Sequence, residues 1–165
     1  MTGEKKQSAT RYHKKTMLSA ADRLLTEHGY DGMNMNMLAK EAGYSKATVY
    51  VYFESKDDIV RALCIERLTV VKSEIALIVK SDLSFDDKLA ELKRVLDELS
   101  TEDKVYFDFI CDNGVSMDSE REIELKGLVD GIIDKVTEIM PRDEAAARFY
   151  AYYGRLKTHG LFDGD

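Results

Sequence analysis

The chain has 165 residues, of which 44% are hydrophobic and 33% are charged, a balance typical of a soluble globular protein rather than a disordered one. No run of about eighteen apolar residues occurs and the N-terminal segment is polar and basic, so the sequence predicts neither a membrane span nor a secretory signal, and a cytoplasmic protein is expected. The two cysteines, Cys64 and Cys111, lie far apart, which favours free thiols over a structural disulfide.

The net charge of −7 is distributed unevenly. Residues 1–56 hold nine basic and six acidic side chains, a local charge of +3, which leaves −10 for the rest of the chain. Five of these basic residues belong to the N-terminal segment: Lys5, Lys6, Arg11, Lys14 and Lys15. Such a segment suits a flexible arm attracted to phosphate, although charged termini are usually only solvated.

The spacing of apolar residues predicts an all-α protein of eight or nine helices, because β-branched alternation is sparse and only one proline interrupts the chain. A first amphipathic helix is predicted over residues 12–28 and is closed by Gly29. A short second helix over residues 35–42 follows, and Asn34 is its expected N-cap.

The pattern of residues 36–53 predicts two short helices separated by a turn at a glycine. Gly43 can adopt the left-handed conformation that ends a helix, and Ser45 can accept hydrogen bonds from the first amides of the next. In that second helix Val49 and Phe53 lie four residues apart and are expected to face inward. The outward positions are Lys46, Ala47, Thr48, Tyr50 and Tyr52. A helix tip that offers these side chains suits phosphates and groove edges, so the segment is interpreted as a DNA-reading element.

A long helix is predicted over residues 56–80, capped by Ser55, and a helix of that length can belong to two modules. Ser84 opens a fifth helix, and an aromatic-rich sixth covers about residues 102–111. These helices supply the chain's central region.

The last two helices are predicted over residues 119–140 and 142–159, on either side of Pro141. Three glycines within them leave room for a close approach of another helix: Gly127, Gly131 and Gly154. Pairing with a second copy of the chain would use that room, so a homodimer through the last two helices is predicted. Contacts within one chain remain the alternative.

From about Lys14 to Ala62 the sequence resembles the tetracycline-repressor (TetR) family of bacterial transcriptional regulators. The resemblance rests on residues 17–21, Gly29-Tyr30, residues 38–53 and residues 55–59. It implies an N-terminal helix-turn-helix DNA-binding domain, residues 1–55 including the basic arm. The long fourth helix would join this domain to a helical effector-binding and dimerisation domain, residues 56–165.

The resemblance also implies which residues contact DNA. Lys46 and Thr48 fall where the family touches bases and phosphates, Tyr50 and Tyr52 where its aromatics reach the backbone, and Lys56 where the fourth helix grips phosphate. Three positions depart from the family pattern: Asn34 replaces a capping threonine, Tyr44 a common valine, and Ala47 a frequent glycine. Tyr44 either packs in the turn or lies on a phosphate.

The function implied is a sequence-specific, ligand-responsive repressor that binds a palindromic, double-stranded DNA operator as a homodimer. A small-molecule effector would bind among the fourth to eighth helices and lower operator affinity. Candidate pocket residues are Tyr106, Phe109, Cys111, Met117 and Phe149, although such residues at helical spacing more often form core. The alternatives are a protein-binding adaptor, or an activator, that uses the helix-turn-helix without small-molecule control.

An enzyme is the opposing class, and the sequence offers little for one. The three histidines are scattered, no Cys or His pair has metal-ligand spacing, and no glycine-rich phosphate loop occurs. Asp57 and Asp58 fit a helix N-terminus, where negative charge favours the helix dipole. The sequence therefore predicts no catalytic residue, metal site or cofactor.

Overall fold

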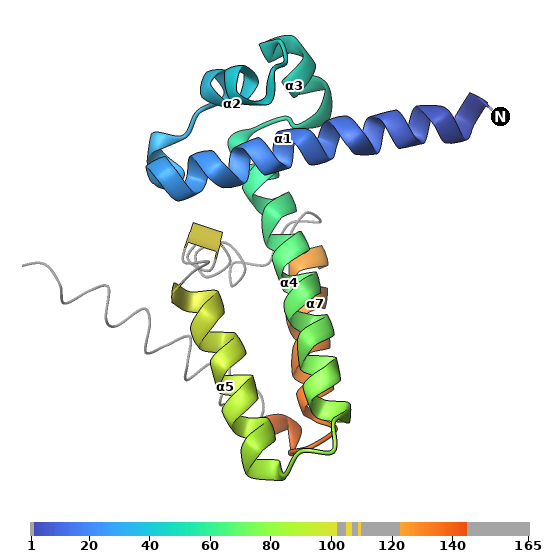
Figure 1. The fold of residues 1–165 in the computed structure, drawn as a ribbon, viewed down its shortest axis with the longest axis vertical. Helices are drawn as coiled ribbons and strands as arrows, with labels where there is room; N and C mark the ends of the chain where they lie inside the picture. Colours follow the sequence, from blue (N-terminus) through green and yellow to red (C-terminus); the bar gives the residue numbers. More distant parts are fainter. Residues whose placement is uncertain (1, 102–104, 107–108, 110–122, 145–165) are drawn as a thin grey trace, which may run out of the picture. The chain divides into compact units, whose positions relative to one another are not determined.

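The computed structural model describes residues 2–101, 105–106, 109 and 123–144, and within these ranges every regular element is helical (Figure 1). The helices are α1 (Thr2–Gly32), α2 (Met35–Ala42), α3 (Lys46–Tyr52), α4 (Lys56–Lys80), α5 (Phe85–Thr101) and α7 (Ile123–Val136). The predicted all-α fold is thereby confirmed. The chain divides into two compact units, Met1–Leu63 and Cys64–Asp165, which are described in turn.

Helix α1 begins at Thr2 rather than at Tyr12, so the prediction of a flexible basic arm is wrong. The early residues are mainly Lys, Gln, Ala, Glu and Arg, which favour helix even without an apolar stripe to announce it. Gly29 interrupts the helical backbone with φ 68° and ψ 179°, as predicted. Because that φ lies in the left-handed region, a residue with a Cβ would be strained there.

The core of the first unit joins its four helices. Helices α2 and α3 lie on one side of α1 (Figure 1), and the first turns of α4 complete the unit. The buried apolar side chains are Met17, Leu18, Ala20, Ala21, Leu24, Leu25, Met33, Leu38, Ala39, Val49, Phe53, Ile59, Val60 and Leu63. Removing that apolar surface from water is the main stabilisation that holds the short helices α2 and α3 in place.

Helix α4 runs from Lys56 to Lys80 as predicted, and Ser55 Oγ accepts a hydrogen bond from the Asp58 amide at 3.2 Å. The boundary between the two units falls after Leu63, inside this helix, rather than at its start. The first turns of α4 contribute Ile59 and Val60 to the buried residues of the first unit, which explains the difference.

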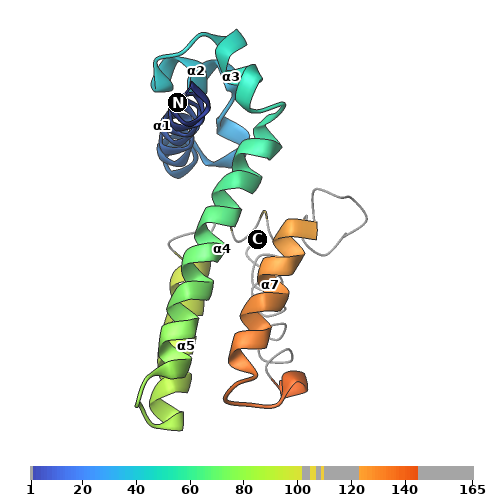
Figure 2. The same ribbon diagram turned by 90° about the vertical axis from the view of Figure 1, so that its right-hand side faces the viewer.

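In the second unit, α5 and α7 run beside the part of α4 that follows Cys64 (Figure 2). Ser84 Oγ accepts from the Asp87 amide at 3.2 Å and so caps α5, as predicted. One apolar cluster is centred on buried Ile133 and Met140, against which four partly buried side chains pack: Leu89, Val129, Val136 and Ile139. This cluster fastens α5 to α7.

Helix α7 ends at Val136, earlier than the predicted end at residue 140. The backbone after Val136 adopts a 3₁₀-type turn, because the Ile139 amide donates to the Val136 carbonyl, three residues earlier, at 3.0 Å. The predicted start of this helix, most of the predicted sixth helix and most of the last helix lie outside the described residues. In the described ranges no helix is long and apolar enough to cross a membrane.

Candidate nucleic-acid interface

The turn between α2 and α3 is fixed by backbone geometry that the sequence predicts. Gly43 adopts φ 74° and ψ 29°, the left-handed cap of α2. The Tyr44 amide then donates to the Ala39 carbonyl at 2.9 Å, which satisfies one of the last carbonyls of the helix. Ser45 Oγ accepts from the Thr48 amide at 3.1 Å and caps α3. The hinge and both capping predictions are confirmed.

Helix α3 presents one face to the core and the other to solvent. Val49 is fully buried and Phe53 is 3% exposed, so the predicted inward face is confirmed. Lys46, Ala47 and Tyr50 are exposed, whereas Thr48 and Tyr52 are half-buried. Lys46 Nζ lies 5.9 Å from the Tyr50 ring centroid, one helical turn away, within cation–π range. The outward face therefore offers a cation, a hydroxyl and phenols.

Asn34 caps α2 through its side-chain carbonyl. Oδ1 accepts from the amides of Asn36 at 3.0 Å and Met37 at 3.1 Å, as predicted. This use of the oxygen leaves the side-chain NH₂ free of the cap bonds and able to donate. Asparagine at this position therefore keeps the cap that the family usually makes with threonine.

Tyr44 is half-buried, and its hydroxyl is 2.8 Å from His13 Nδ1 on α1. The two rings meet edge to face with centroids 5.5 Å apart. The Tyr44 ring thus packs against α1, and because the side chain is only half-buried, a phosphate contact stays a prediction. No local sequence pattern selects His13 as its partner, because the two residues lie on different elements.

Lys56, predicted to grip phosphate, is engaged with Tyr30. Its Nζ donates to the backbone carbonyl of Tyr30 at 2.8 Å and lies 3.8 Å from the centroid of the Tyr30 ring. The Tyr30 hydroxyl in turn donates to Asp57. Burial, followed by the hydrogen bond and the charge of Asp57, raises the pKa of Tyr30 to about 12. We call Tyr30, Lys56 and Asp57 the α4 clasp; the sequence analysis did not find it.

Helix α1 lines the same region with positive charge. Arg11, Lys14 and Lys15 are exposed, and Lys14 Nζ lies 5.6 Å from the ring centroid of Phe53, the residue that follows α3. Arg23 of α1 forms an ion pair with Glu41 of α2 at 3.0 Å. Lys14 is therefore held beside the end of α3, where it adds positive charge.

In the second unit, two predicted pocket residues fall within the described ranges. Tyr106 is 4% exposed and Phe109 is 7% exposed, so both are buried. Cys64 Sγ donates to the Tyr106 carbonyl at 3.6 Å, and the Arg67 guanidinium lies 5.8 Å from the Tyr106 ring centroid. The other candidates, Cys111, Met117 and Phe149, lie outside the described residues.

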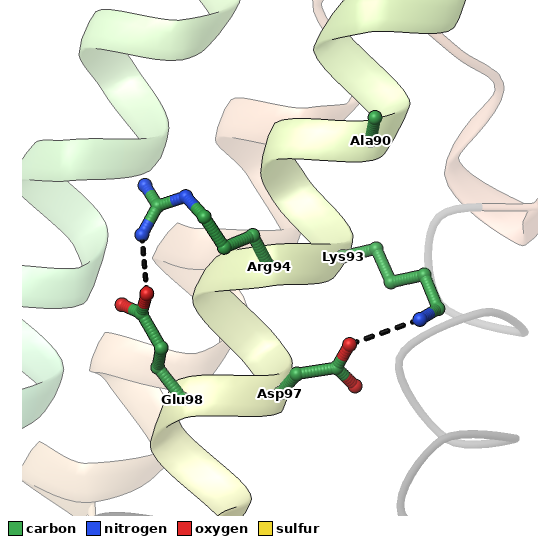
Figure 3. Close-up of a pocket in the computed structure, with 5 residues that line it drawn as sticks. All are labelled: Ala90, Lys93, Arg94, Asp97 and Glu98. Atoms are coloured by element: carbon green, nitrogen blue, oxygen red, sulfur yellow. Dashed lines mark hydrogen bonds and ion pairs between the residues drawn. The ribbon is translucent and has the colours of Figure 1, made fainter.

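A shallow depression on α5 is lined by Ala90, Lys93, Arg94, Asp97 and Glu98 (Figure 3). Its charges are already paired: Lys93 with Asp97 at 2.9 Å, and Arg94 with Glu98 at 2.6 Å. Arg94 also binds Glu74 and Glu91, and these hydrogen bonds raise the pKa of its guanidinium. The depression therefore offers no spare charge to a ligand, and no cluster with metal-binding composition occurs in the described residues.

The sequence profile described as bacterial regulatory proteins, tetR family, matches residues 17–63, the buried helices and the turn just described. Residues 17–63 are thus the helix-turn-helix DNA-binding region of a TetR-type regulator, as the sequence resemblance implied.

Individual relatives agree with this assignment. The chain is 30% identical over 74 residues to the fatty acid metabolism regulator protein of Bacillus subtilis, an alignment that covers 45% of this chain and 38% of the relative. It is 29% identical over 119 residues to the HTH-type transcriptional regulator YvdT of Bacillus subtilis, which covers 71% of this chain and 59% of the relative. The chain thus spans less than two thirds of either relative.

Among solved structures, the fold is similar to FadR from Bacillus subtilis in complex with stearoyl-CoA, with a TM-score of 0.67 and 20% identity. That similarity covers 90% of this chain and 88% of the other. It confirms that a TetR-type fold extends beyond the residues matched by the family profile.

Proposed function

We propose that this TetR-family protein is a transcriptional repressor that binds a palindromic operator as a homodimer, in the cytoplasm, and releases it when a small molecule occupies the second unit. The outward face of α3 is the observation that carries the proposal. On this face Lys46 and Tyr50 are exposed and Thr48 is half-buried, while the fully buried Val49 holds the helix in a TetR-family domain. The role is one of binding, without a catalytic residue or cofactor.

The DNA contacts divide by chemistry. Lys46, Ala47 and Thr48 stand at the start of α3, the part of a recognition helix that meets base edges in the major groove. Phosphate contacts are assigned to Asn34, Tyr44, Tyr50 and Tyr52, which offer amide or phenol donors. Lys56 spends one N–H on the Tyr30 carbonyl and, with three donors on its ammonium, still has hydrogens for a phosphate.

The homodimer would form through the last two helices. In the described part of α7, Gly127 is exposed and has no neighbouring atom within 4 Å of a Cβ built on it, and Ile123 is 65% exposed. An open glycine beside an exposed apolar residue favours the close approach of a second helix. Two-fold pairing would present two recognition helices to successive major grooves and so require a palindromic operator.

For the effector, a fatty acyl-CoA is the first class to test. The fatty acid metabolism regulator is a relative of this chain, and the structurally similar FadR was solved with stearoyl-CoA. The buried Tyr106 and Phe109 supply apolar surface of the kind that an acyl chain needs. Binding in the second unit would lower operator affinity by favouring a dimer geometry that no longer matches the half-site spacing.

The experiment is a fluorescence-anisotropy titration of the DNA upstream of the protein's own gene, against a scrambled duplex of equal length. Wild type should prefer the upstream DNA, and Lys46→Ala should weaken binding and lower the log-log salt slope by about 0.9 per lost phosphate contact. Lys93→Ala, which removes an exposed lysine on α5, is the matched control and should bind as wild type does. Equal affinity of wild type for both duplexes at every salt concentration would exclude specific regulation.

Control by a ligand is tested on the same complex. Stearoyl-CoA should release wild type from the upstream DNA, while free coenzyme A should not. A reporter driven by that DNA separates repression from activation, because deletion of the gene raises expression in the first case and lowers it in the second. Unchanged expression on deletion, together with unchanged DNA binding, would favour the adaptor alternative.

A further inference from the structure

His13 occupies a position between the two tyrosines that flank the recognition helix. Tyr44 precedes the Ser45 cap, and its hydroxyl lies 2.8 Å from His13 Nδ1. Tyr52 is the last residue of α3, and its ring centroid lies 6.2 Å from that of His13, at an interplanar angle of 55°. Thus one imidazole on α1 lies against the tyrosine in the turn before α3 and against the last residue of α3.

The backbone of the turn does not depend on this contact. Gly43 and the hydrogen bond from the Tyr44 amide to the Ala39 carbonyl already set the chain path. What His13 adds is the orientation of the Tyr44 ring and hydroxyl, which otherwise rotate about two side-chain torsions. The imidazole itself is held against Tyr12 on its own helix, with ring centroids 5.8 Å apart.

The chemistry of the hydroxyl decides what that orientation can do. A phenol has one hydrogen to donate and two lone pairs with which to accept. If Tyr44 donates to His13, its hydrogen is already used and a phosphate oxygen gains nothing from it. If His13 Nδ1–H donates instead, the phenol hydrogen stays available to a DNA phosphate, and the accepted bond polarises it.

We propose that His13 is a positioning residue for DNA binding: its Nδ1–H donates to the Tyr44 hydroxyl in the complex and directs the phenol hydrogen to a backbone phosphate. The inference rests on the proposed function for the location of DNA and adds a residue on α1 that does not itself touch the duplex. The contact is to phosphate, so it acts on every DNA sequence alike.

The test is a double-mutant cycle on a duplex of random sequence at low salt, read by anisotropy. His13→Ala and Tyr44→Phe should each weaken binding by about three- to tenfold, the range for one hydrogen bond. The double variant should be no weaker than either single variant, since both remove the same contact. His13→Asn should recover most of the affinity, because the asparagine amide can donate from close to the Nδ1 position.

Urea unfolding of the same variants separates positioning from folding. His13→Ala should lose more DNA affinity than the fraction of unfolded protein in that variant can account for. The control variant Tyr12→Phe should bind DNA as wild type does. Additive effects of His13→Ala and Tyr44→Phe, or no recovery in His13→Asn, would overturn the inference. The random duplex contains no operator. If wild type binds the upstream DNA and the random duplex equally well, specific regulation is refuted, but the role of His13 can still be measured on the random duplex. A wild type that binds no duplex would refute both.

Discussion

The α4 clasp gives a prediction that can be worked out from its geometry. Tyr30→Phe removes the hydroxyl that donates to Asp57 but keeps the ring beneath Lys56 and the backbone carbonyl that Lys56 binds. Asp57 is exposed, so its carboxylate regains water when the hydroxyl is lost. The free energy of unfolding should therefore fall by about 0.5 to 1.5 kcal/mol, the net value of one such hydrogen bond.

The same contact sets a pH dependence whose sign follows from the pKa. Burial and Asp57 disfavour the phenolate, and they raise the pKa of Tyr30 from 10.0 to about 12 in the folded chain. The stabilisation is therefore complete below about pH 10 and is lost as the pH rises through about 12. In a fully buried group a pKa shift of that size would correspond to about 2.7 kcal/mol of folding stability. Because solvent screens this half-exposed side chain, we expect a loss of stability of about 1 kcal/mol at high pH.

The assay is urea unfolding of wild type and Tyr30→Phe at about pH 8 and about pH 11. Comparing the two proteins at each pH cancels the titration of the other tyrosines and lysines. Tyr12→Phe is the matched control, because Tyr12 is 68% exposed and far from Asp57 in the sequence. The reasoning is refuted if the difference between wild type and Tyr30→Phe is the same at both pH values, or grows at the higher one.

Substitutions at three further positions test single features by urea unfolding. Asn34→Ala should cost about 1 kcal/mol because the α2 cap is lost, while Asn34→Asp should keep it; equal losses would refute the cap. Gly43→Ala should cost about 1 to 2 kcal/mol through backbone strain alone, since a Cβ meets no atom within 4 Å there, and Gly43→Asn should cost less. Arg94→Gln should leave the midpoint of urea unfolding almost unchanged despite three carboxylate partners, because the network is exposed and screened by solvent; a large drop in the midpoint would contradict this.

The features that the sequence predicted well are local. The Asn34 and Ser45 caps, the left-handed Gly43 and the inward pair Val49 and Phe53 each depend on residues within about one helical turn. Capping and helical periodicity act over that range, so a single sequence contains the information needed. The N-terminal part of α1 was not predicted as helix because it lacks an apolar stripe, and hydrophobic periodicity reveals a helix only through the face that it buries.

The contacts that the sequence did not predict join residues far apart in the chain. Lys56 and Tyr30 are 26 positions apart, and His13 and Tyr44 are 31 positions apart. Which side chains meet over such separations depends on how the helices cross, and no local rule supplies the crossing. The family resemblance named Lys56, Tyr44 and the Gly29-Tyr30 pair, but it did not reveal that Lys56 binds Tyr30.

The α4 clasp also changes what Lys56 means for DNA binding. The resemblance made it a phosphate contact at the start of a helix, whereas in the structure it binds the carbonyl of Tyr30, next to Gly29 with its left-handed φ. The start of α4 is therefore fastened to the segment that follows the long part of α1, within the same unit as α3. Any displacement of the first turn of α4 must carry that segment with it or break the clasp, so Lys56 links the position of α4 to the DNA-binding domain whether or not it also reaches a phosphate.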